Sequence, residues 1–478
     1  MGWSVPEVPA RAPATAWSPW VCLFIILFGV FIGLAWAMFS APAGGLSFPS
    51  SGLWLPLTGY MLVSIMAAIT VYLLWWEGLA LGSYYWNSWR LNMRAAWQRQ
   101  AHQYLCVASQ VILTPDPQCI PQLIGLASSD DSENKPTTLL PAESLIPGIS
   151  RFEKLCQTLI TQATASLARW YPVGPITVVI QTSADIPEQQ QRITEIWQQQ
   201  ALPWSATIEV LPAVFPFEYW NNQLLATSHP VLVLALHYRQ PDETQAEFAS
   251  ALLLAPASLL SVVEQRDAVR LFRAMPLKIS KLTAELKELR DMAQQPAEAV
   301  RLVWFSGLTA PQSQRLTTAT YDLSLSLCSS APMAGVIDFD KGSERYGYLA
   351  AWLMISAATE AVNYDMGSHW LVWADDQQAW AMAAGSQTPV PDHEPEIAQA
   401  APFPAGGMML AILLNALLLW FLASSYPTGL FSWWGTTCVL LVLGITLPGI
   451  ALIVRKIASR LLLPEFIRAA GEHERNVE

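Results

Sequence analysis

The sequence predicts an α/β domain built from two tandem halves, each with the order β-α-β-α-β-β, and flanked by two transmembrane helical hairpins. The composition is 53% hydrophobic and only 13% charged, whereas soluble domains carry about 25% charged residues. The apolar excess is concentrated at the two ends of the chain. Between them, β-branched runs alternate with helical stretches, and the same order of elements occurs twice.

Four apolar segments are expected to cross a bilayer, since about 20 helical residues span a hydrocarbon core of about 30 Å. Aromatic residues such as Trp75, Trp76, Trp433 and Trp434 lie at their ends, as is typical of membrane interfaces. A cleaved signal peptide is the alternative for the first segment, but a second apolar segment follows at once. The segments are residues 20–39, 57–76, 407–424 and 434–454.

Polar residues are few within these segments. Glu77 lies at the end of the second, and Asn415 in the third is typical of an amide joining two helices. A transport path usually needs ionisable groups inside the membrane, so a transporter is disfavoured. Gly29 and Gly33 have the GxxxG spacing of close helix contacts, although chance spacing explains it equally well.

Basic residues indicate the orientation of both hairpins. The short connectors, residues 40–56 and 425–431, contain no Lys or Arg, whereas basic residues follow the second and fourth segments. The positive-inside rule therefore places both termini and the middle domain in the cytoplasm, at a bacterial inner membrane. The basic residues are Arg90, Arg94, Arg99, Arg455, Lys456 and Arg460.

The middle domain is acidic. Residues 101–400 hold 17 Lys and Arg against 31 Asp and Glu, a net charge of 17 − 31 = −14. Because phosphate backbones are bound by Lys and Arg, nucleic acid is not an expected partner. The expected partners are the bilayer and other membrane or secretion-machine proteins, and the oligomeric state stays open.

The predicted organisation has six parts. The middle domain continues the second span as a juxtamembrane helix over about residues 84–110, and its two halves cover about residues 171–265 and 299–386. The closing hairpins of the halves match best, with strands at 231–238 and 246–254 in the first and at 370–374 and 379–384 in the second. The parts are a tail (1–19), a hairpin (20–83), the α/β domain (84–386), a Pro-rich acidic linker (387–404), a second hairpin (405–456) and a second tail (457–478).

A helix is expected to join the two halves. Leu282, Leu286, Leu289 and Met292 recur at three and four residues and mark one apolar face. A solvated amphipathic connector and a partner-binding helix are the two interpretations.

The layout of two α/β halves with closing hairpins resembles the thiolase and ketosynthase fold. Residues 346–351 (YGYLAA) are similar to the Gly-His-x-x-Ala-Ala helix start of ketosynthases. That family uses a Cys nucleophile and two His residues, which stabilise the oxyanion. Tyr348 stands at the position of one His, residues 305–309 contain no other, and Cys328 lies in the wrong half. The resemblance thus implies a thiolase-like domain that has lost its chemistry.

Membrane-anchored domains of this kind resemble accessory proteins of bacterial type VI secretion, including a lipase-adaptor family. That family is periplasmic, whereas the arginine positions place this domain inside. The two expectations about sidedness therefore conflict.

Chemical motifs are sparse. The sequence contains no GxSxG, GxxxxGK[ST], GxGxxG, CxxC or HExxH, so we expect no catalytic residue, cofactor or metal. Carboxyl ends of strands are common ligand sites, and a helix start binds anions, so residues 335–344 are a weak candidate, with a capped turn as the alternative. His237 and His369 occupy matching places in the two halves and either face each other or are structural. The weak ligand-site candidates are Asp338, Asp340, Ser343, Tyr348 and His369.

The expected function is an accessory or scaffold role in an envelope assembly such as type VI secretion, without enzymatic activity. The alternative is a membrane-bound enzyme acting on acyl or lipid substrates. It requires Cys328, His369 or the Asp338–Asp340 cluster to line a pocket.

Overall fold

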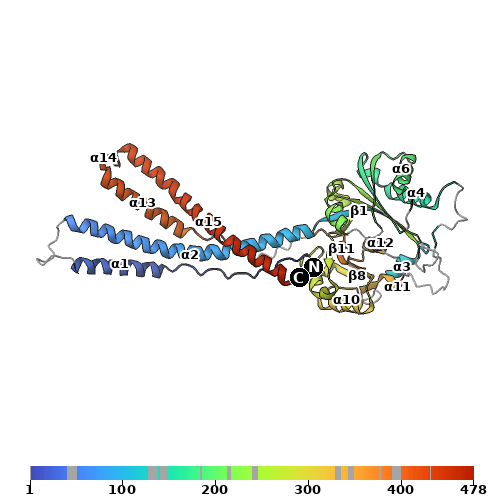
Figure 1. The fold of residues 1–478 in the computed structure, drawn as a ribbon, viewed down its shortest axis with the longest axis horizontal. Helices are drawn as coiled ribbons and strands as arrows, with labels where there is room; N and C mark the ends of the chain where they lie inside the picture. Colours follow the sequence, from blue (N-terminus) through green and yellow to red (C-terminus); the bar gives the residue numbers. More distant parts are fainter. Residues whose placement is uncertain are drawn as a thin grey trace. The chain divides into compact units, whose positions relative to one another are not determined.

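The protein forms two compact units in the computed structural model (Figure 1). One comprises Met1–Val5 and Ala95–His393, and the other comprises Pro6–Arg94 and Glu394–Glu478. The structure describes residues 2–39, 51–126, 138–139, 148–183, 186–212, 217–238, 246–328, 335–342, 349–375, 378–389, 400–430 and 432–477.

The first unit is an α/β domain around one mixed sheet, which confirms the α/β class predicted for the middle of the chain. The path through the sheet is β3-β2-β4-β5-β1-β6-β11-β10-β8-β9, with β7 paired to β11. The strands are β1 (Tyr104–Leu113), β2 (Gly174–Thr182), β3 (Trp204–Val210), β4 (Val231–His237), β5 (Phe248–Ala255), β6 (Val269–Phe272), β7 (Met275–Leu277), β8 (Val300–Ser306), β9 (Val336–Asp338), β10 (Ser368–Ala374) and β11 (Ala379–Gly385).

The same strand order occurs in both halves of this sheet. In the first half β2 pairs in parallel with β3 and β4, and β4 pairs with β5 in antiparallel. In the second half β8 pairs in parallel with β9 and β10, and β10 pairs with β11 in antiparallel. Strands β1 and β6 join the halves in the middle of the sheet.

Helices cover both faces of each half. Because side chains alternate along a strand, Val231, Val233 and Ala235 face a central core whereas Leu232 and Leu234 face an outer one. The outer faces are covered by α4 and α6 in the first half and by α9 and α10 in the second. The helices are α3 (Cys119–Leu123), α4 (Arg151–Thr164), α5 (Leu167–Trp170), α6 (Gln189–Gln199), α7 (Phe217–Asn222), α8 (Val262–Asp267), α9 (Leu282–Asp291), α10 (Ala310–Asp322), α11 (Phe339–Gly342) and α12 (Ala350–Asn363).

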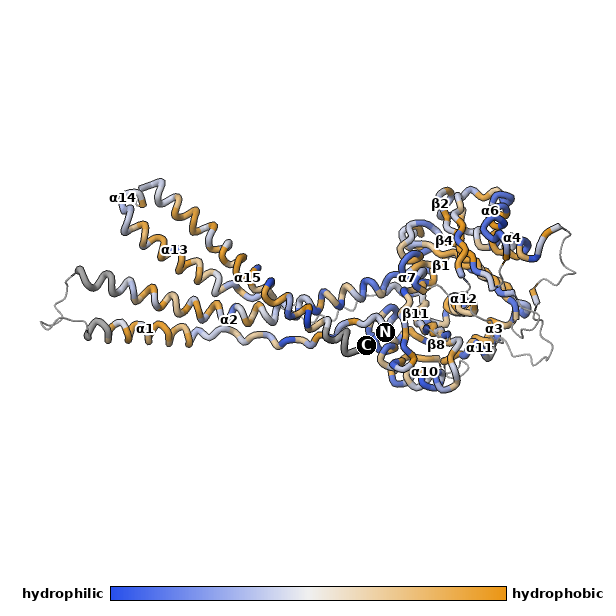
Figure 2. The backbone as a smooth tube through the Cα atoms, in the orientation of Figure 1, coloured by the Kyte–Doolittle hydropathy of each residue, from blue (hydrophilic) through white to orange (hydrophobic). Residues whose placement is uncertain are grey.

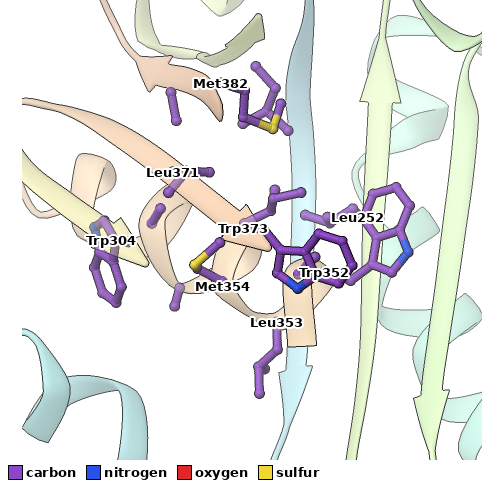
Figure 3. Close-up of a cluster of buried hydrophobic side chains, with 14 of the residues drawn as sticks. Leu252, Trp304, Trp352, Leu353, Met354, Leu371, Trp373 and Met382 are labelled. Atoms are coloured by element: carbon purple, nitrogen blue, oxygen red, sulfur yellow. The ribbon is translucent and has the colours of Figure 1, made fainter. Parts of the chain in front are cut away.

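Helix α12 forms the central layer between the two halves. It packs against β1 and β5 on one side and against β8, β10 and β11 on the other. Trp352 and Met354 on α12 meet Leu252 from the first half and Trp304 and Trp373 from the second (Figure 3). The domain is therefore layered as helix, sheet, helix, sheet, helix.

One predicted element boundary is wrong. Residues 84–110 were expected to be a continuous helix, but α2 ends at Ala101 and β1 begins at Tyr104. Leu105 and Cys106 are buried in the domain, where β1 pairs with both β5 and β6. Two-sided pairing in the middle of a sheet outweighs the helical propensity of the preceding residues.

The second unit consists of long helices and an extended N-terminal segment. Three described helical stretches are long and apolar enough to cross a membrane: Thr58–Ala101, Ala405–Ser425 and Trp433–Gly471. The apolar stretch of the first expected span, Pro19–Ala35, is shorter than that criterion requires. Hydrophobic residues dominate these stretches and give way to polar residues along α2 and α15 (Figure 2). The helices are α1 (Pro19–Phe39), α2 (Ser51–Ala101), α13 (Ala405–Ser425), α14 (Pro427–Leu430) and α15 (Trp433–Val477).

Glycines allow close contacts between these helices. A Cβ at Gly29 would lie 2.5 Å from a side-chain carbon of Ile65, and one at Gly33 would lie 2.4 Å from the sulfur of Met61. Both glycines of the GxxxG pattern therefore face α2. The rings of Tyr60 on α2 and Trp420 on α13 lie 5.7 Å apart, so α13 also contacts α2.

Candidate functional site

Asp338 and Asp340 lie where β9 runs into α11, at the carboxyl edge of the sheet. The Asp340 carboxylate accepts hydrogen bonds from Ser306 Oγ at 2.9 Å and from the Gly307 amide at 2.7 Å. Gly307 has φ +77°, and a Cβ there would lie 1.8 Å from the carbonyl oxygen of Ala374. Asp340 thus pins a tight turn after β8, as expected for the structural alternative.

Asp338 has a similar local role. Its Oδ1 accepts a hydrogen bond from the Asp340 amide at 3.1 Å, which is the pattern of an Asx turn. Ser343 and Tyr348 lie outside the described residues. The ligand site predicted from these residues therefore stays a prediction.

His369 is fully buried near the start of β10. Trp304 Nε1 donates to its Nδ1 at 3.3 Å, and its Nε2 lies 3.4 Å from the carbonyl oxygen of Met366. Nδ1 is therefore the acceptor and Nε2 carries the proton. Burial lowers the pKa of His369 to about 4, so the ring is neutral at pH 7.

The structure does not bring His369 to the two aspartates. In the strand register His369 pairs with Leu302 of β8, whereas Asp338 pairs with Phe305. The two positions are three residues apart along β8, which is roughly 10 Å at 3.3 Å per residue. They belong to opposite ends of the parallel strands.

His237 has different surroundings. It ends β4, and its ring stacks on Phe248 with centroids 5.8 Å apart. Four strands, β5, β1, β6 and β11, separate β4 from β10 in the sheet. Each histidine thus packs within its own half.

The best-built polar site in the described residues was not expected from sequence. It lies in the second unit, where the N-terminal segment runs along α2. The Arg11 amide donates to Asn87 Oδ1 at 3.0 Å, and Asn87 Nδ2 donates to the Arg11 carbonyl at 2.8 Å. Trp86 Nε1 donates to the carbonyl oxygen of Pro9 at 2.9 Å. The side-chain amide of Asn87 thus pairs with the Arg11 backbone through two hydrogen bonds, as the backbone of a neighbouring strand would.

The end of α15 completes this site. Arg11 forms an ion pair with Glu465 at 2.6 Å, and its guanidinium lies 3.6 Å from the centroid of the Trp86 ring. The Trp86 ring meets Phe466 edge-on at 5.3 Å. We call these residues the collar: Val8, Pro9, Arg11, Trp86, Asn87, Glu465 and Phe466.

The N-terminal segment is held at further points. Trp76 Nε1 donates to the carbonyl oxygen of Thr15 at 2.7 Å, and the Ser18 amide donates to Tyr72 Oη at 3.0 Å. The segment contains Pro6, Pro9 and Pro13, and prolines favour an extended chain that loses little entropy on docking. The prolines between Trp3 and Trp17 are a sequence signal from which this element could have been predicted, but we made no such prediction.

Residues 2–5 belong to the first unit and pack on α9. Trp3 is buried in the same core as Leu282, Leu286 and Leu289, and the Val5 amide donates to Glu288 at 3.1 Å. Burial raises the pKa of Glu288, and the hydrogen bond from Val5 opposes that shift. The apolar face of the joining helix is thus covered by other parts of this chain.

A buried carboxylate holds the start of α13 in the second unit. Glu77 is 0% exposed, and its Oε2 accepts a hydrogen bond from the Gly407 amide at 2.8 Å. Gly407 lies in the first turn of α13, where free amides and the helix dipole favour a negative charge. A Cβ at Gly406 would lie 2.6 Å from the backbone of Leu74. Glu77 is therefore a capping group for a neighbouring helix.

Comparisons with known proteins extend only to the fold. No family model matches the chain, and no curated protein matches it. Over about 60% of its length the chain resembles condensing enzymes of the thiolase and ketosynthase type. A ketosynthase with its acyl-carrier protein (AntDE:AntF) matches with a TM-score of 0.42, 10% identity and coverage of 60% of this chain and 99% of that one.

Two further condensing enzymes match to a similar extent. The tetronic acid condensing enzyme AbyA1 has a TM-score of 0.38, 10% identity and coverage of 59% of this chain and 99% of that one. A variant of OleA from Xanthomonas campestris has a TM-score of 0.36, 10% identity and coverage of 59% and 98%. Likenesses this distant concern the fold and give no information about activity.

Proposed function

We propose that this protein is an accessory or scaffold component of a bacterial inner-membrane assembly, and that its α/β domain binds other proteins rather than catalysing a reaction. A type VI secretion machine is the assembly we name as the first candidate. The membrane helices anchor the domain, and the collar stabilises the anchor.

The collar is the observation that carries this proposal. It joins three segments that are far apart in the sequence, namely the N-terminal segment, the part of α2 around Trp86 and Asn87, and the C-terminal part of α15. Its hydrogen bonds use the backbone of Pro9 and Arg11, so they fix the path of the N-terminal segment. A stable anchor is what a membrane-bound scaffold requires.

The structural roles of the polar groups in the α/β domain also support a scaffold. The Asp340 carboxylate is engaged by Ser306 and Gly307, and His369 is buried against Trp304. Asp340 thus stabilises the turn after β8, and the neutral ring of His369 packs within the core of the domain.

The contacts also support one side of the membrane for both termini and the domain. Residues 2–5 pack within the domain unit, and Arg11 contacts the end of α15. If each hairpin crosses the membrane an even number of times, both of its ends lie on the same side, as these contacts require. The positive-inside rule then places that side in the cytoplasm.

Two experiments test the proposal. Reporters fused after Gln200 and after Glu478 are expected to show cytoplasmic fluorescence and no periplasmic phosphatase activity. Activity after Gln200 would reverse the sidedness and favour a periplasmic adaptor. Crosslinking in intact membranes followed by purification in detergent is expected to retain specific partner proteins, and a preparation that retains none counts against a scaffold.

The alternative remains a membrane-bound enzyme that acts on acyl or lipid substrates. The observation in its favour is Cys328, which is only partly buried, in contrast to Cys106 and Cys156. Thioester chemistry needs an accessible thiolate. Loss of an acyl-transfer activity in a Cys328→Ala variant, with Cys22→Ala as control, would favour the enzyme over the scaffold.

A further inference from the structure

A cavity of about 270 Å³ lies between α13 and α15, next to the connecting helix α14. One face of each helix lines it, because the lining residues recur every three or four positions from Asn415 to Leu422 on α13 and from Gly435 to Leu443 on α15. Tyr426 and Leu430 line the end near α14. The cavity therefore follows the axis of the hairpin.

The length of this cavity corresponds to one leaflet of a bilayer. Ten residues separate Asn415 from Ser425, the last residue of α13. At 1.5 Å per residue the helix rises about 15 Å over that distance, which is half of a hydrocarbon core of about 30 Å. The inner end of the cavity lies near the bilayer midplane and the outer end near the interface, where Trp433 and Trp434 are exposed.

The chemistry of the lining indicates a hydrocarbon occupant. Asn415 is the only amide among the lining residues, and its Nδ2 already donates to the carbonyl oxygen of Ala411 at 2.8 Å and to Thr446 Oγ1 at 2.7 Å. The deep part of the cavity is otherwise apolar. Tyr426, at the outer end, is 67% exposed and lies where a lipid headgroup would be.

The volume decides between a lipid chain and another helix. A helix with its side chains is about 10 Å wide, so a length of about 15 Å occupies roughly 1200 Å³. The empty space between the helices, its open side included, is about 720 Å³, so a helix does not fit whereas an extended hydrocarbon chain does.

We propose that the α13–α15 hairpin is a lipid-binding site, which holds one acyl chain of a diacyl phospholipid in the leaflet that borders α14. The headgroup lies beside Tyr426, and the chain reaches toward Asn415. This site is independent of the scaffold role, because it requires only the second hairpin.

The test uses the full-length protein in nanodiscs made of phosphatidylcholine, with a fraction of the lipid carrying a diazirine in the middle of one acyl chain. After irradiation, mass spectrometry locates the crosslinks. We expect them to concentrate on Leu422, Cys438 and Val442, which line the cavity. Leu440 and Leu441 are 65% and 60% exposed on other sides of α15 and report contact with bulk lipid.

Matched variants separate a bound chain from bulk lipid. Cys438→Phe fills the cavity, so crosslinks on Leu422 are expected to fall several-fold, whereas Leu440→Phe adds the same ring outside the cavity and leaves them unchanged. Val442→Phe fills the cavity from the next turn if Cys438→Phe does not fold. Equal labelling of the cavity face and of Leu440 and Leu441 in the wild-type protein would overturn the proposal, as would crosslinks between two copies of the hairpin.

Discussion

Replacing Asn87 is expected to release the N-terminal segment from the collar. The side chain is 9% exposed, and it makes two hydrogen bonds to the backbone of Arg11, of 3.0 and 2.8 Å. A hydrogen bond of this kind stabilises by about 0.5–1.5 kcal/mol, so Asn87→Ala removes about 1–3 kcal/mol of local stability. The opening equilibrium of the segment rises by about 5-fold to 150-fold, since 1.4 kcal/mol corresponds to a factor of ten.

Hydrogen exchange measures this effect at one amide. The Arg11 N–H is the donor to Asn87 Oδ1, so its exchange rate in the full-length protein is expected to rise by the same factor in Asn87→Ala. Asn87→Asp keeps the acceptor and loses the donor to the Arg11 carbonyl, so its rate should lie between those of Asn87→Ala and the wild type. Gln100→Ala, an exposed change on α2, is the control. An unchanged Arg11 rate in Asn87→Ala would refute the reasoning.

The remaining predictions concern one histidine and the long apolar helices. His369 has a pKa of about 4 in the folded state against about 6.5 when unfolded, so its stabilising contribution is complete above pH 6.5 and is lost as the pH falls toward 4. The loss amounts to about 3 kcal/mol. In His369→Asn the denaturant midpoint of unfolding should therefore depend less on pH over this range. A midpoint that falls equally in both proteins contradicts this. Gly406→Ala places a Cβ against the backbone of Leu74 and should lower the melting temperature in detergent, whereas Gly444→Ala, where a Cβ meets nothing within 4 Å, should not; equal melting temperatures would show that the contact is unimportant. Glu77→Ala removes the cap of the Gly407 amide and costs about 1–2 kcal/mol, whereas Glu77→Gln keeps the acceptor and should retain most of the stability, as measured by thermal unfolding.

Local patterns predicted the strands well. Residues 231–238 and 370–374 are continuous apolar runs, as strands buried on both faces require, and the structure has β4 at Val231–His237 and β10 at Ser368–Ala374. The repeated order of elements also follows from local signals, because each half carries its own strands, helices and turns. The GxxxG spacing alone did not show whether Gly29 and Gly33 contact another helix, and in the structure both face α2.

Contacts between distant parts of the chain could not be predicted from the sequence. The helical pattern after the second span continues past the point where the chain becomes β1, and only pairing with β5 and β6 decides that boundary. The collar joins Arg11 to Glu465, which are 454 residues apart. A periodic pattern of apolar residues gives no information about such a contact. Glu77 was expected at the edge of its span, and its role depends on the start of α13, 330 residues away.

The pairing of Arg11 with Glu465 bears on the order in which the protein is assembled. Arg11 precedes Glu465 by 454 residues, so the collar cannot close until α15 has been synthesised. Until then Trp86 and Phe466 lack each other as partners, and the N-terminal segment lacks its ion pair. A chain that stops before Phe466 would therefore leave the rings of Trp86 and Trp89 without the aromatic ring on which they pack.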